Sequence, residues 1–407
     1  MTSSALPVEL KQILRHTGRL IRITPKQQRQ QQQPPKRQRQ ACYSTTSSRY
    51  RGATGSRRHI TSEGRTTQPS WSKLPELPRR SPWYFETGYS IFAKRPTRPF
   101  PPPFVSYPSG SYSDPLTTHQ RNDYRHPKVD GELLRGITNG DDAIIIDGQN
   151  FLAVNDGVGA WAQKERGHAA LWSRLIAHYW AAELEKFFCS FASGDNKPAP
   201  IELEQISPID LLDKAYNRSQ LATNKGEENE IQGTTTVSSA LLHHNAAGKP
   251  VVLATILGDC AVLVLRPNTQ ETLYKSEEQW HWFDCPRQLG TNSPDTPQGN
   301  AVCDAVPVQE GDIVLCLSDG VTDNLWEEEL VDKTCHAVRQ WRDKAPEAED
   351  GVVYVARTLM ESARDIAMDP NAGSPYMERA IDEGLAAEGG KLDDISVVIG
   401  VVRKAND

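Results

Sequence analysis

The chain of 407 residues is long enough for one large domain or two ordinary ones, and its charge is divided unevenly. Residues 1–80 carry 17 Lys and Arg against 3 Asp and Glu, whereas the rest carries 29 against 49, so a net charge of +14 precedes one of −20. No apolar run approaches the roughly 18 residues of a membrane span, which excludes a transmembrane helix. The seven cysteines show no C-x-x-C spacing, and several lie in apolar runs. This is typical of reduced core residues in an intracellular protein.

The basic leader has the composition of a mitochondrial transit peptide. Its first 60 residues contain one acidic residue, Glu9, against 13 basic ones, and apolar residues between positions 10 and 21 can share one side of a short helix. An Arg- and Ser-rich, acid-poor amphipathic start is typical of mitochondrial import, whereas a secretory signal needs a continuous apolar stretch. We therefore expect a transit peptide and low-complexity leader over 1–80, processing near 39–44, and residence in the mitochondrial matrix. A basic tail that binds nucleic acid is the alternative, although the acidic body argues against a nucleic-acid partner.

The body, residues 81–407, shows strand and helix signals that predict one α+β domain. The aromatic and β-branched segment 82–95 predicts the first strand, and a Pro- and Ser-rich loop follows over 98–125. The turn signal Asp147-Gly148 joins a strand that begins at 141 to another over 151–155. Further strands are expected over 234–242, 251–257, 261–266, 301–308, 313–317 and 395–403, and helices over 164–189, 208–221, 327–341, 351–368 and 375–387. Hairpins and paired helices of this kind favour an antiparallel sheet over alternating βαβ units.

Aspartates recur where the predicted strands end. The apolar run Ile313–Leu317 predicts a buried strand that stops at Ser318-Asp319-Gly320, with Asp323 four residues later. An Asp-Gly pair after a strand is ordinarily a turn, but the pattern recurs at Asp141/Asp142, Asp156, Asp259 and Asp393/Asp394. A cluster of carboxylates is unstable unless cations fill it, and oxygen-only ligands suit Mg²⁺ and Mn²⁺. We therefore predict two or three such ions at this cluster.

Six short motifs occur in order between residues 140 and 403. They are Gly140-Asp141-Asp142-Ala143, Asn155-Asp156-Gly157-Val158-Gly159, Gly233-Thr234-Thr235-Thr236, Leu257-Gly258-Asp259, Ser318-Asp319-Gly320-Val321-Thr322-Asp323-Asn324 and Lys391-Leu392-Asp393-Asp394-Ile395-Ser396. In this order they resemble the metal-dependent type 2C serine/threonine protein phosphatases, the PPM family. The segments 82–94 and 283–290 resemble the mitochondrial branch of this family. The resemblance implies a four-layer α-β-β-α sandwich of two antiparallel sheets flanked by helices.

The resemblance also implies a role for each aspartate. Asp156 would bridge two metal ions beside the carbonyl of Gly157, and Asp319 and Asp393 would hold the first ion. Asp141 would act on the second ion through water. Asp259 and Asp323 would hold a looser third ion, while Asp142 and Asp394 would orient the ligands. The residues expected to be catalytic are Asp156, Asp319 and Asp393.

The activity implied is hydrolysis of phosphoserine and phosphothreonine on mitochondrial proteins (EC 3.1.3.16) by a metal-activated water on a binuclear Mg²⁺ or Mn²⁺ centre. Two close ions lower the pKa of a shared water and neutralise charge on the phosphoryl oxygens, so no phosphoenzyme is needed. We expect a monomer whose partners are phosphoprotein substrates. The alternative is a non-catalytic or weakly active member of the fold that serves as a regulatory or binding module.

Three positions depart from the family pattern. Asn155 stands where Ala or Val is usual, and Ala160 stands where a second glycine is usual. Ile137 stands where many relatives have an arginine that grips the substrate phosphate, and Arg135 is the nearest base.

Two further motifs are expected to be structural. His243-His244 is expected at a loop tip and not as a metal-ligand pair, and the segment 233–236 is expected to serve packing and turn formation.

Overall fold

A computed structural model gives the fold of the chain over residues 81–104, 127–191, 201–224, 226, 230–343 and 350–405. These residues belong to one compact unit, Cys42–Asp407. The expected leader over 1–80 and most of the expected loop over 98–125 lie outside the described residues. None of the helices in the described part of the chain has the length and apolarity to cross a lipid bilayer.

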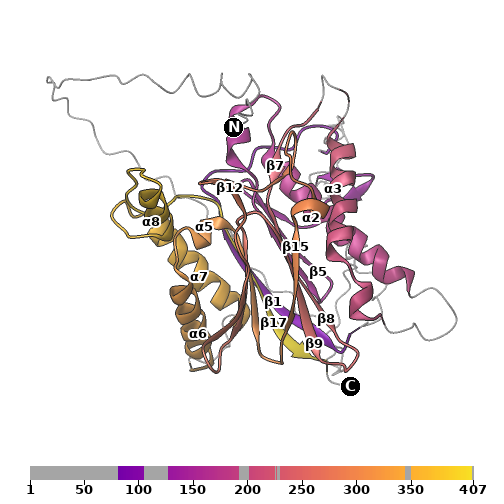
Figure 1. The fold of residues 1–407 in the computed structure, drawn as a ribbon, viewed down its shortest axis with the longest axis vertical. Coiled ribbons are helices and arrows are strands. Elements are labelled where there is room, and N and C mark those ends of the chain that lie inside the picture. The colour runs from indigo at the N-terminus through magenta and orange to yellow at the C-terminus, as the bar shows by residue number, and fades with distance from the viewer. Residues whose placement is uncertain are drawn as a thin grey trace, which may run out of the picture. The chain divides into compact units, whose positions relative to one another are not determined.

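Two antiparallel sheets form the centre of the fold (Figure 1). The five-stranded sheet has the order β1 (Trp83–Phe92), β17 (Ile395–Lys404), β16 (Ile313–Leu317), β10 (Ala261–Arg266) and β11 (Glu271–Lys275). The six-stranded sheet has the order β15 (Val302–Pro307), β9 (Pro250–Leu257), β8 (Val237–His244), β6 (Phe151–Asn155), β5 (Asp142–Asp147) and β4 (Ile137–Asn139). Three two-stranded pairs complete the strands: β2 (Lys128–Val129) with β3 (Glu132–Leu133), β7 (Thr234–Thr235) with β14 (Leu289–Gly290), and β12 (Trp280–Trp282) with β13 (Cys285–Pro286).

Helices cover the outer face of each sheet, as Figure 1 shows. The six-stranded sheet is covered by α2 (Ala169–Ser190) and α3 (Pro208–Thr223), and the five-stranded sheet by α6 (Glu327–Asp343) and α7 (Gly351–Ala367). The short helices are η4 (Gly159–Gln163), η5 (Leu203–Gln205), α4 (Pro297–Asn300), α5 (Asp319–Thr322) and α8 (Pro375–Asp382). The expected α+β class and the α-β-β-α order of layers are therefore confirmed.

The central strands are apolar on both faces because each sheet is covered on both sides. In β6, Phe151 and Ala153 face the helices α2 and α3, whereas Leu152 and Val154 face the opposite sheet. The same alternation in β16 places Leu315 against the α6–α7 layer and Val314 between the sheets. Side chains alternate along a strand with a period of two, so a strand buried on both faces appears in the sequence as a continuous apolar run.

Capping residues set where several helices begin. The Ser207 and Ser374 hydroxyls accept hydrogen bonds from the backbone of α3 and α8, each followed by a proline at the first helical position. Helix α2 begins at Ala169 and not at the predicted 164, because the His168 side chain caps it, accepting from the Leu171 N–H at 3.2 Å. Helix α8 ends at Asp382, short of the predicted 387.

The expectation that His243 and His244 lie at a loop tip was wrong. The strand expected over 234–242 is interrupted at Thr236 and continues to His244, so His243 and His244 lie in β8 and not in a loop. The His243 ring is buried, and its Nε2 lies 2.8 Å from the Ile201 carbonyl oxygen. His244 Nδ1 lies 3.2 Å from the Ser81 hydroxyl. Both rings therefore serve the packing of β8.

Candidate functional site

The strand ends that carry aspartates lie at one end of the two sheets. Antiparallel pairing of Ala143 with Asn155 puts the start of β5 beside the end of β6, and pairing of Leu317 with Val397 puts the end of β16 beside the start of β17. The Ser396 hydroxyl, from one sheet, donates to Asp142 Oδ2 of the other at 2.7 Å. Residues that are about 250 positions apart in sequence are thereby brought together.

Asp394 connects three segments through its carboxylate. Its Oδ1 accepts from the Lys94 N–H at 2.8 Å, and its Oδ2 accepts from the Asp141 N–H at 2.9 Å. Gly140 has a φ of +64°, and a Cβ at that position would overlap the Asp394 carboxylate. A glycine is therefore required where the turn before β5 meets Asp394.

The backbone at Asp156 is held by two threonines. Its carbonyl oxygen accepts from Thr235 Oγ1 at 2.8 Å and from the Thr236 N–H at 2.9 Å, and its own N–H donates to Thr236 Oγ1 at 3.2 Å. These contacts agree with the packing role expected for the segment 233–236, but the turn expected there is instead the short strand β7. At Gly157, a Cβ would overlap the carbonyl oxygen of Asp141, so the loop after β6 closes tightly on the loop before β5.

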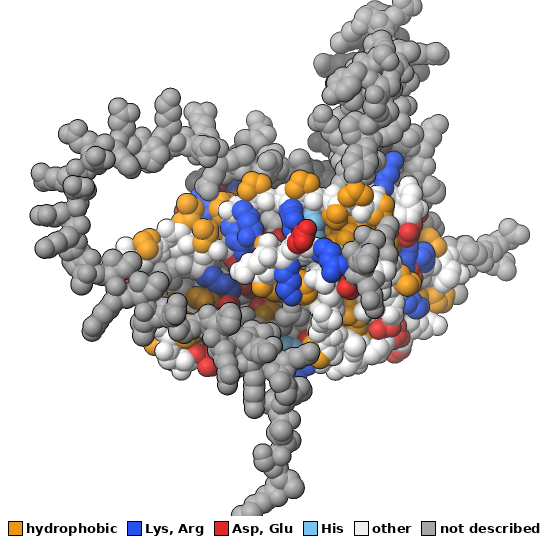
Figure 2. Space-filling model, turned by 90° about the horizontal axis from the view of Figure 1, so that it is seen from above, with side chains coloured by type: hydrophobic (Ala, Val, Ile, Leu, Met, Phe, Trp, Pro, Cys, Tyr) orange, Lys and Arg blue, Asp and Glu red, His pale blue; other side chains and the backbone are white. Residues whose placement is uncertain are grey.

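Four basic side chains extend into the carboxylate cluster, and the sequence analysis assigned none of them a role. Lys94 pairs with Asp393, and Arg95 Nη2 lies 2.5 Å from Asp141 Oδ2. Lys391 Nζ lies 3.0 Å from Asp319 and 2.7 Å from Asp323, and Arg379 pairs with Asp323 and with Glu278. Seen from above this end of the sheets, Lys and Arg side chains gather over the face (Figure 2). Lys94 and Lys391 lie in quoted motifs, but Arg95 and Arg379 carry no signal in the sequence.

The carboxylates shift one another's proton affinities. Burial raises the pKa of Asp156, Asp142 and Asp259 well above the ordinary value, and Asp319 and Asp394 beside them add to the rise. Burial also raises the pKa of Asp323 to about 7 and that of Asp394 to about 6. For Asp319, burial alone would raise the pKa, but the Lys391 ammonium and a hydrogen bond with Asp156 outweigh it, so the net shift is downward. The eight aspartates of the cluster therefore share four basic side chains.

The donor set fits a hard cation. Buried oxygens of three carboxylates, Asp142 Oδ1, Asp259 Oδ1 and Asp319 Oδ1, have no hydrogen-bond partner within the described part of the chain. Orphaned anionic oxygens at this depth are costly unless a cation meets them. No three His, Cys, Asp or Glu side chains in the described segments converge into a finished metal cage. The carboxylates are instead paired with the four basic side chains.

The departures from the family pattern are resolved in part. Asn155 is buried, and its amide donates to the Ser173 carbonyl of α2 at 2.9 Å, so it fastens β6 to that helix. Arg135 pairs with Asp147 at 3.0 Å and with Glu185, away from the cluster. Ile137 is 37% exposed on β4. Arg135 is therefore not a substitute for the arginine missing at 137.

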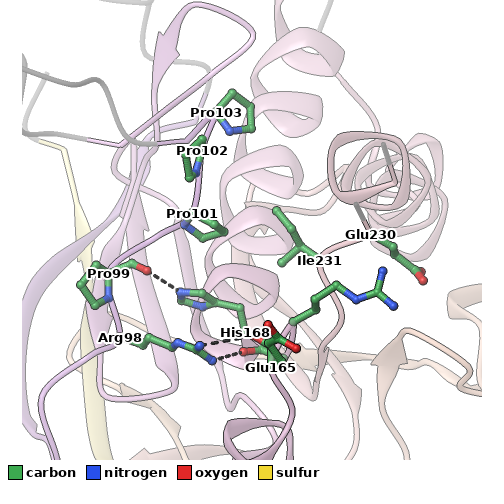
Figure 3. A pocket seen from close by; sticks show the side chains of 11 residues that line it. Arg98, Pro99, Pro101, Pro102, Pro103, Glu165, His168, Glu230 and Ile231 are labelled. Atoms are coloured by element: carbon green, nitrogen blue, oxygen red, sulfur yellow. Dashed lines mark hydrogen bonds between the residues drawn. The ribbon is translucent and has the colours of Figure 1, made fainter. Parts of the chain in front are cut away.

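A separate hollow of about 660 Å³ lies beside the start of α2 (Figure 3). A proline-rich segment, Pro99 and Pro101–Pro103, forms one wall of it. Arg98 also lines the hollow and donates to the carbonyls of Gly167 and Glu165, at 3.0 and 3.2 Å. None of the predicted aspartates lines this hollow, so the carboxylate cluster is a site distinct from it.

Curated proteins with similar sequences are protein phosphatases. The chain is 30% identical to the protein phosphatase PTC7 homolog fig of Drosophila willistoni over 62% of this chain and 72% of that protein. It is 28% identical to the Xenopus laevis protein phosphatase PTC7 homolog, over 68% of this chain and 86% of that protein. It is 30% identical to the probable protein phosphatase 2C 80 of Arabidopsis thaliana, with 65% of this chain covered but only 55% of that longer protein.

A solved structure is also similar. The photosystem II phosphatase PBCP matches 66% of this chain and 93% of its own with a TM-score of 0.50 and 26% identity. The chain matches no protein-family model. The motif order, the sandwich fold and the phosphatase relatives agree: the chain belongs to the type 2C, or PPM, family of protein phosphatases.

Proposed function

We propose that the chain is a metal-dependent protein serine/threonine phosphatase that hydrolyses phosphoserine and phosphothreonine (EC 3.1.3.16). The observation that carries the proposal is the gathering of carboxylates from separate chain segments at one end of the sheets, where three buried oxygens have no partner among the residues that the structure describes. That end also carries exposed basic side chains, which suit an anionic substrate (Figure 2).

The metal ligands proposed are Asp141, Asp156, the Gly157 carbonyl, Asp319 and Asp393, with Asp259 and Asp323 at an outer position. Mg²⁺ or Mn²⁺ bound there would supply an activated water and offset the charge of the phosphoryl group. The chain's own contribution is to position these groups. Asp394 fixes the loop at Asp141, Ser396 orients Asp142, and Thr235 and Thr236 hold the backbone at Asp156.

Three of the described cysteines, Cys260, Cys285 and Cys316, are not set up as nucleophiles. Burial raises the pKa of Cys260 and Cys316, so both are thiols at neutral pH. Burial also raises the pKa of the half-buried Cys285. Direct attack by water on phosphorus, without a phosphoenzyme, is therefore the mechanism that these residues support.

We further propose that the protein works in the mitochondrial matrix on phosphoproteins there. The support is the composition of residues 1–80, with its net charge of +14 and its scarcity of acidic residues. N-terminal sequencing of protein from fractionated cells tests this. An intact Met1 on cytosolic protein would contradict it.

The activity is tested by hydrolysis of a phosphothreonine peptide by the full-length protein, with and without Mn²⁺. We expect turnover that requires the metal and is lost on chelation. A chain that binds the phosphopeptide without turning it over would instead be the non-catalytic binding module.

A further inference from the structure

Ile137 occupies the position at which many relatives have an arginine that binds the substrate phosphate. In this chain the phosphate therefore needs another cation. Two arginines near that position are already engaged. Arg135 pairs with Asp147 and Glu185, and the Arg174 guanidinium donates to Thr138 Oγ1 and to the carbonyls of Leu134 and Arg135. Neither has a carboxylate of the cluster as a partner. The missing charge has to come from a different element.

The segment after β1 delivers two cations to the cluster. Strand β1 runs antiparallel to β17 with Phe92 opposite Ile395, so the residues after Phe92 lie beside those before Ile395. The Lys94 N–H is fixed on the Asp394 carboxylate, and its ammonium pairs with Asp393. The next residue, Arg95, places Nη2 2.5 Å from Asp141 Oδ2. Sheet register therefore sets the position of both side chains.

Both cations converge on one space above the loop that follows Asp156. The point where a Cβ of Gly159 would lie is 3.7 Å from Arg95 Nη2, 3.7 Å from Lys94 Nζ and 3.8 Å from Asp141 Oδ2. Because residue 159 is a glycine, it places no side chain of its own in this space. The Arg95 side chain is 46% exposed, so the space can be reached from solvent.

We propose that Arg95, assisted by Lys94, binds the phosphate of the substrate in place of the arginine absent at position 137. The ligand is a phosphate monoester dianion, and this inference rests on the proposed phosphatase function. A guanidinium has five N–H donors, and the contact with Asp141 involves one of its three nitrogens. Its planar fork suits two phosphate oxygens better than the single point charge of a lysine does.

The test measures inorganic phosphate as a competitive inhibitor of the Mn²⁺-loaded full-length protein, together with KM and kcat for a phosphothreonine peptide. Arg95→Gln removes a charge-assisted hydrogen bond to the phosphate. We therefore expect it to weaken phosphate binding about 10- to 100-fold and to raise KM by a similar factor. Arg95→Lys keeps the charge but loses the planar guanidinium, so its phosphate affinity should lie between that of wild type and that of Arg95→Gln. Mn²⁺ affinity by calorimetry should stay equal or rise in both variants, because a cation that competes for Asp141 is removed or weakened.

Arg403→Gln is the matched control. Arg403 also pairs with a carboxylate, Glu86, at 2.7 Å, but it lies opposite Tyr84 near the other end of β1. The phosphate affinity of the Arg403→Gln variant should equal that of wild type.

The outcomes separate the two proposals. A wild-type protein without Mn²⁺-dependent turnover defeats the proposed function. An active wild type, with phosphate affinity in Arg95→Gln and Arg95→Lys within about twofold of it, defeats only the role of Arg95. Loss of Mn²⁺ binding together with phosphate binding in Arg95→Gln would make Arg95 a structural support of Asp141, and would also overturn the inference. If Arg95→Gln does not fold, Arg95→Lys decides alone.

Discussion

Asp156 is the residue on which the proposed chemistry depends most. Its backbone is fixed by Thr235 and Thr236, and the Asp319 carboxylate adds to the rise that burial causes in its pKa. Asp156→Asn replaces one oxygen by an amide nitrogen and removes one negative charge from the cluster. Loss of an activated water costs several kcal/mol of transition-state stabilisation, so turnover should fall at least about 10³-fold. Mn²⁺-dependent hydrolysis and circular dichroism check this together, since the fold should be kept. Activity within about tenfold of wild type would remove Asp156 from the site.

Asp323 should matter less for metal binding than Asp319 and Asp393 do. It pairs with two of the chain's own cations, Lys391 and Arg379, whereas Asp319 and Asp393 each pair with one, so more of its charge is already neutralised. We expect Asp323→Ala to slow turnover while Mn²⁺ still binds, and Asp319→Ala to prevent binding. Isothermal calorimetry distinguishes the two variants. Complete loss of metal binding in Asp323→Ala would show that this division into inner and outer ligands is wrong.

His178 should make the fold sensitive to acid. Burial, with Arg135, Arg218 and Arg174 nearby, lowers its pKa from 6.5 to about 4. Its Nδ1 accepts from the Arg135 N–H at 3.1 Å, a bond that protonation would break. The pKa of His178 is lower in the folded state than in the unfolded state. The neutral ring therefore contributes its full stabilisation above pH 6.5, and the free energy of unfolding falls by roughly 3 kcal/mol as pH falls toward 4.

The pH dependence of urea unfolding tests His178. His178→Gln keeps an acceptor for the Arg135 N–H, and its unfolding free energy should fall less steeply between pH 6.5 and 4 than that of wild type. His336→Gln, an exposed position on α6, is the control and should follow wild type. Equal slopes in wild type and His178→Gln would contradict the assignment.

At the scale of elements, the sequence predicted strands well where both faces are covered. The runs 313–317 and 261–266 match β16 and β10. The strands β4 and β11 were not predicted, because their residues are largely exposed or half-buried and give no apolar run. Helix α5 was not predicted either, since Ser318-Asp319-Gly320 is a turn signal by composition alone. Whether such short elements form depends on tertiary contacts and not on a local sequence pattern.

Close packing of β1 against α7 predicts that Gly88 tolerates no side chain. A Cβ there would lie 2.7 Å from the Val353 nitrogen and 2.8 Å from the Val352 carbonyl carbon, both backbone atoms at the start of α7. Gly88→Ala should displace α7 and lower the free energy of unfolding by about 1–3 kcal/mol. Gly373→Ala meets only Trp326, at 3.5 Å, and should cost much less. Denaturant unfolding compares the two, and equal stabilities would contradict the packing argument.

At the scale of the whole molecule, the aspartates of the site could be predicted but their cations could not. Acids at strand ends give a local signal, and an antiparallel sandwich gathers such ends. The pairs Lys94–Asp393 and Arg379–Asp323 join residues that are 299 and 56 positions apart. No local pattern marks such pairs, because each depends on the sheet register or on the placement of a loop.

Strand β17 should be indispensable to the fold. It lies between β1 and β16, and β1 has it as its only sheet neighbour among the described strands. A chain ending at residue 390 would lose this strand and also Asp393 and Asp394. We expect it to be degraded at once by a protease that wild type resists, whereas removal of residues 406 and 407 alone should change little. Protease resistance of the shorter chain would contradict the central place of β17.

The pairing of β1 with β17 also has a consequence for biosynthesis. A ribosome makes β1 first, but its partner strand emerges only after about 300 further residues have been translated, the separation between Lys94 and Asp394. Until then the nascent chain exposes a strand edge and the apolar faces of both sheets, which invites chaperone binding. Two of the carboxylates proposed for the site, Asp393 and Asp394, directly precede β17. On the proposed roles of these residues, a chain not yet translated as far as β17 should be unable to remove phosphate.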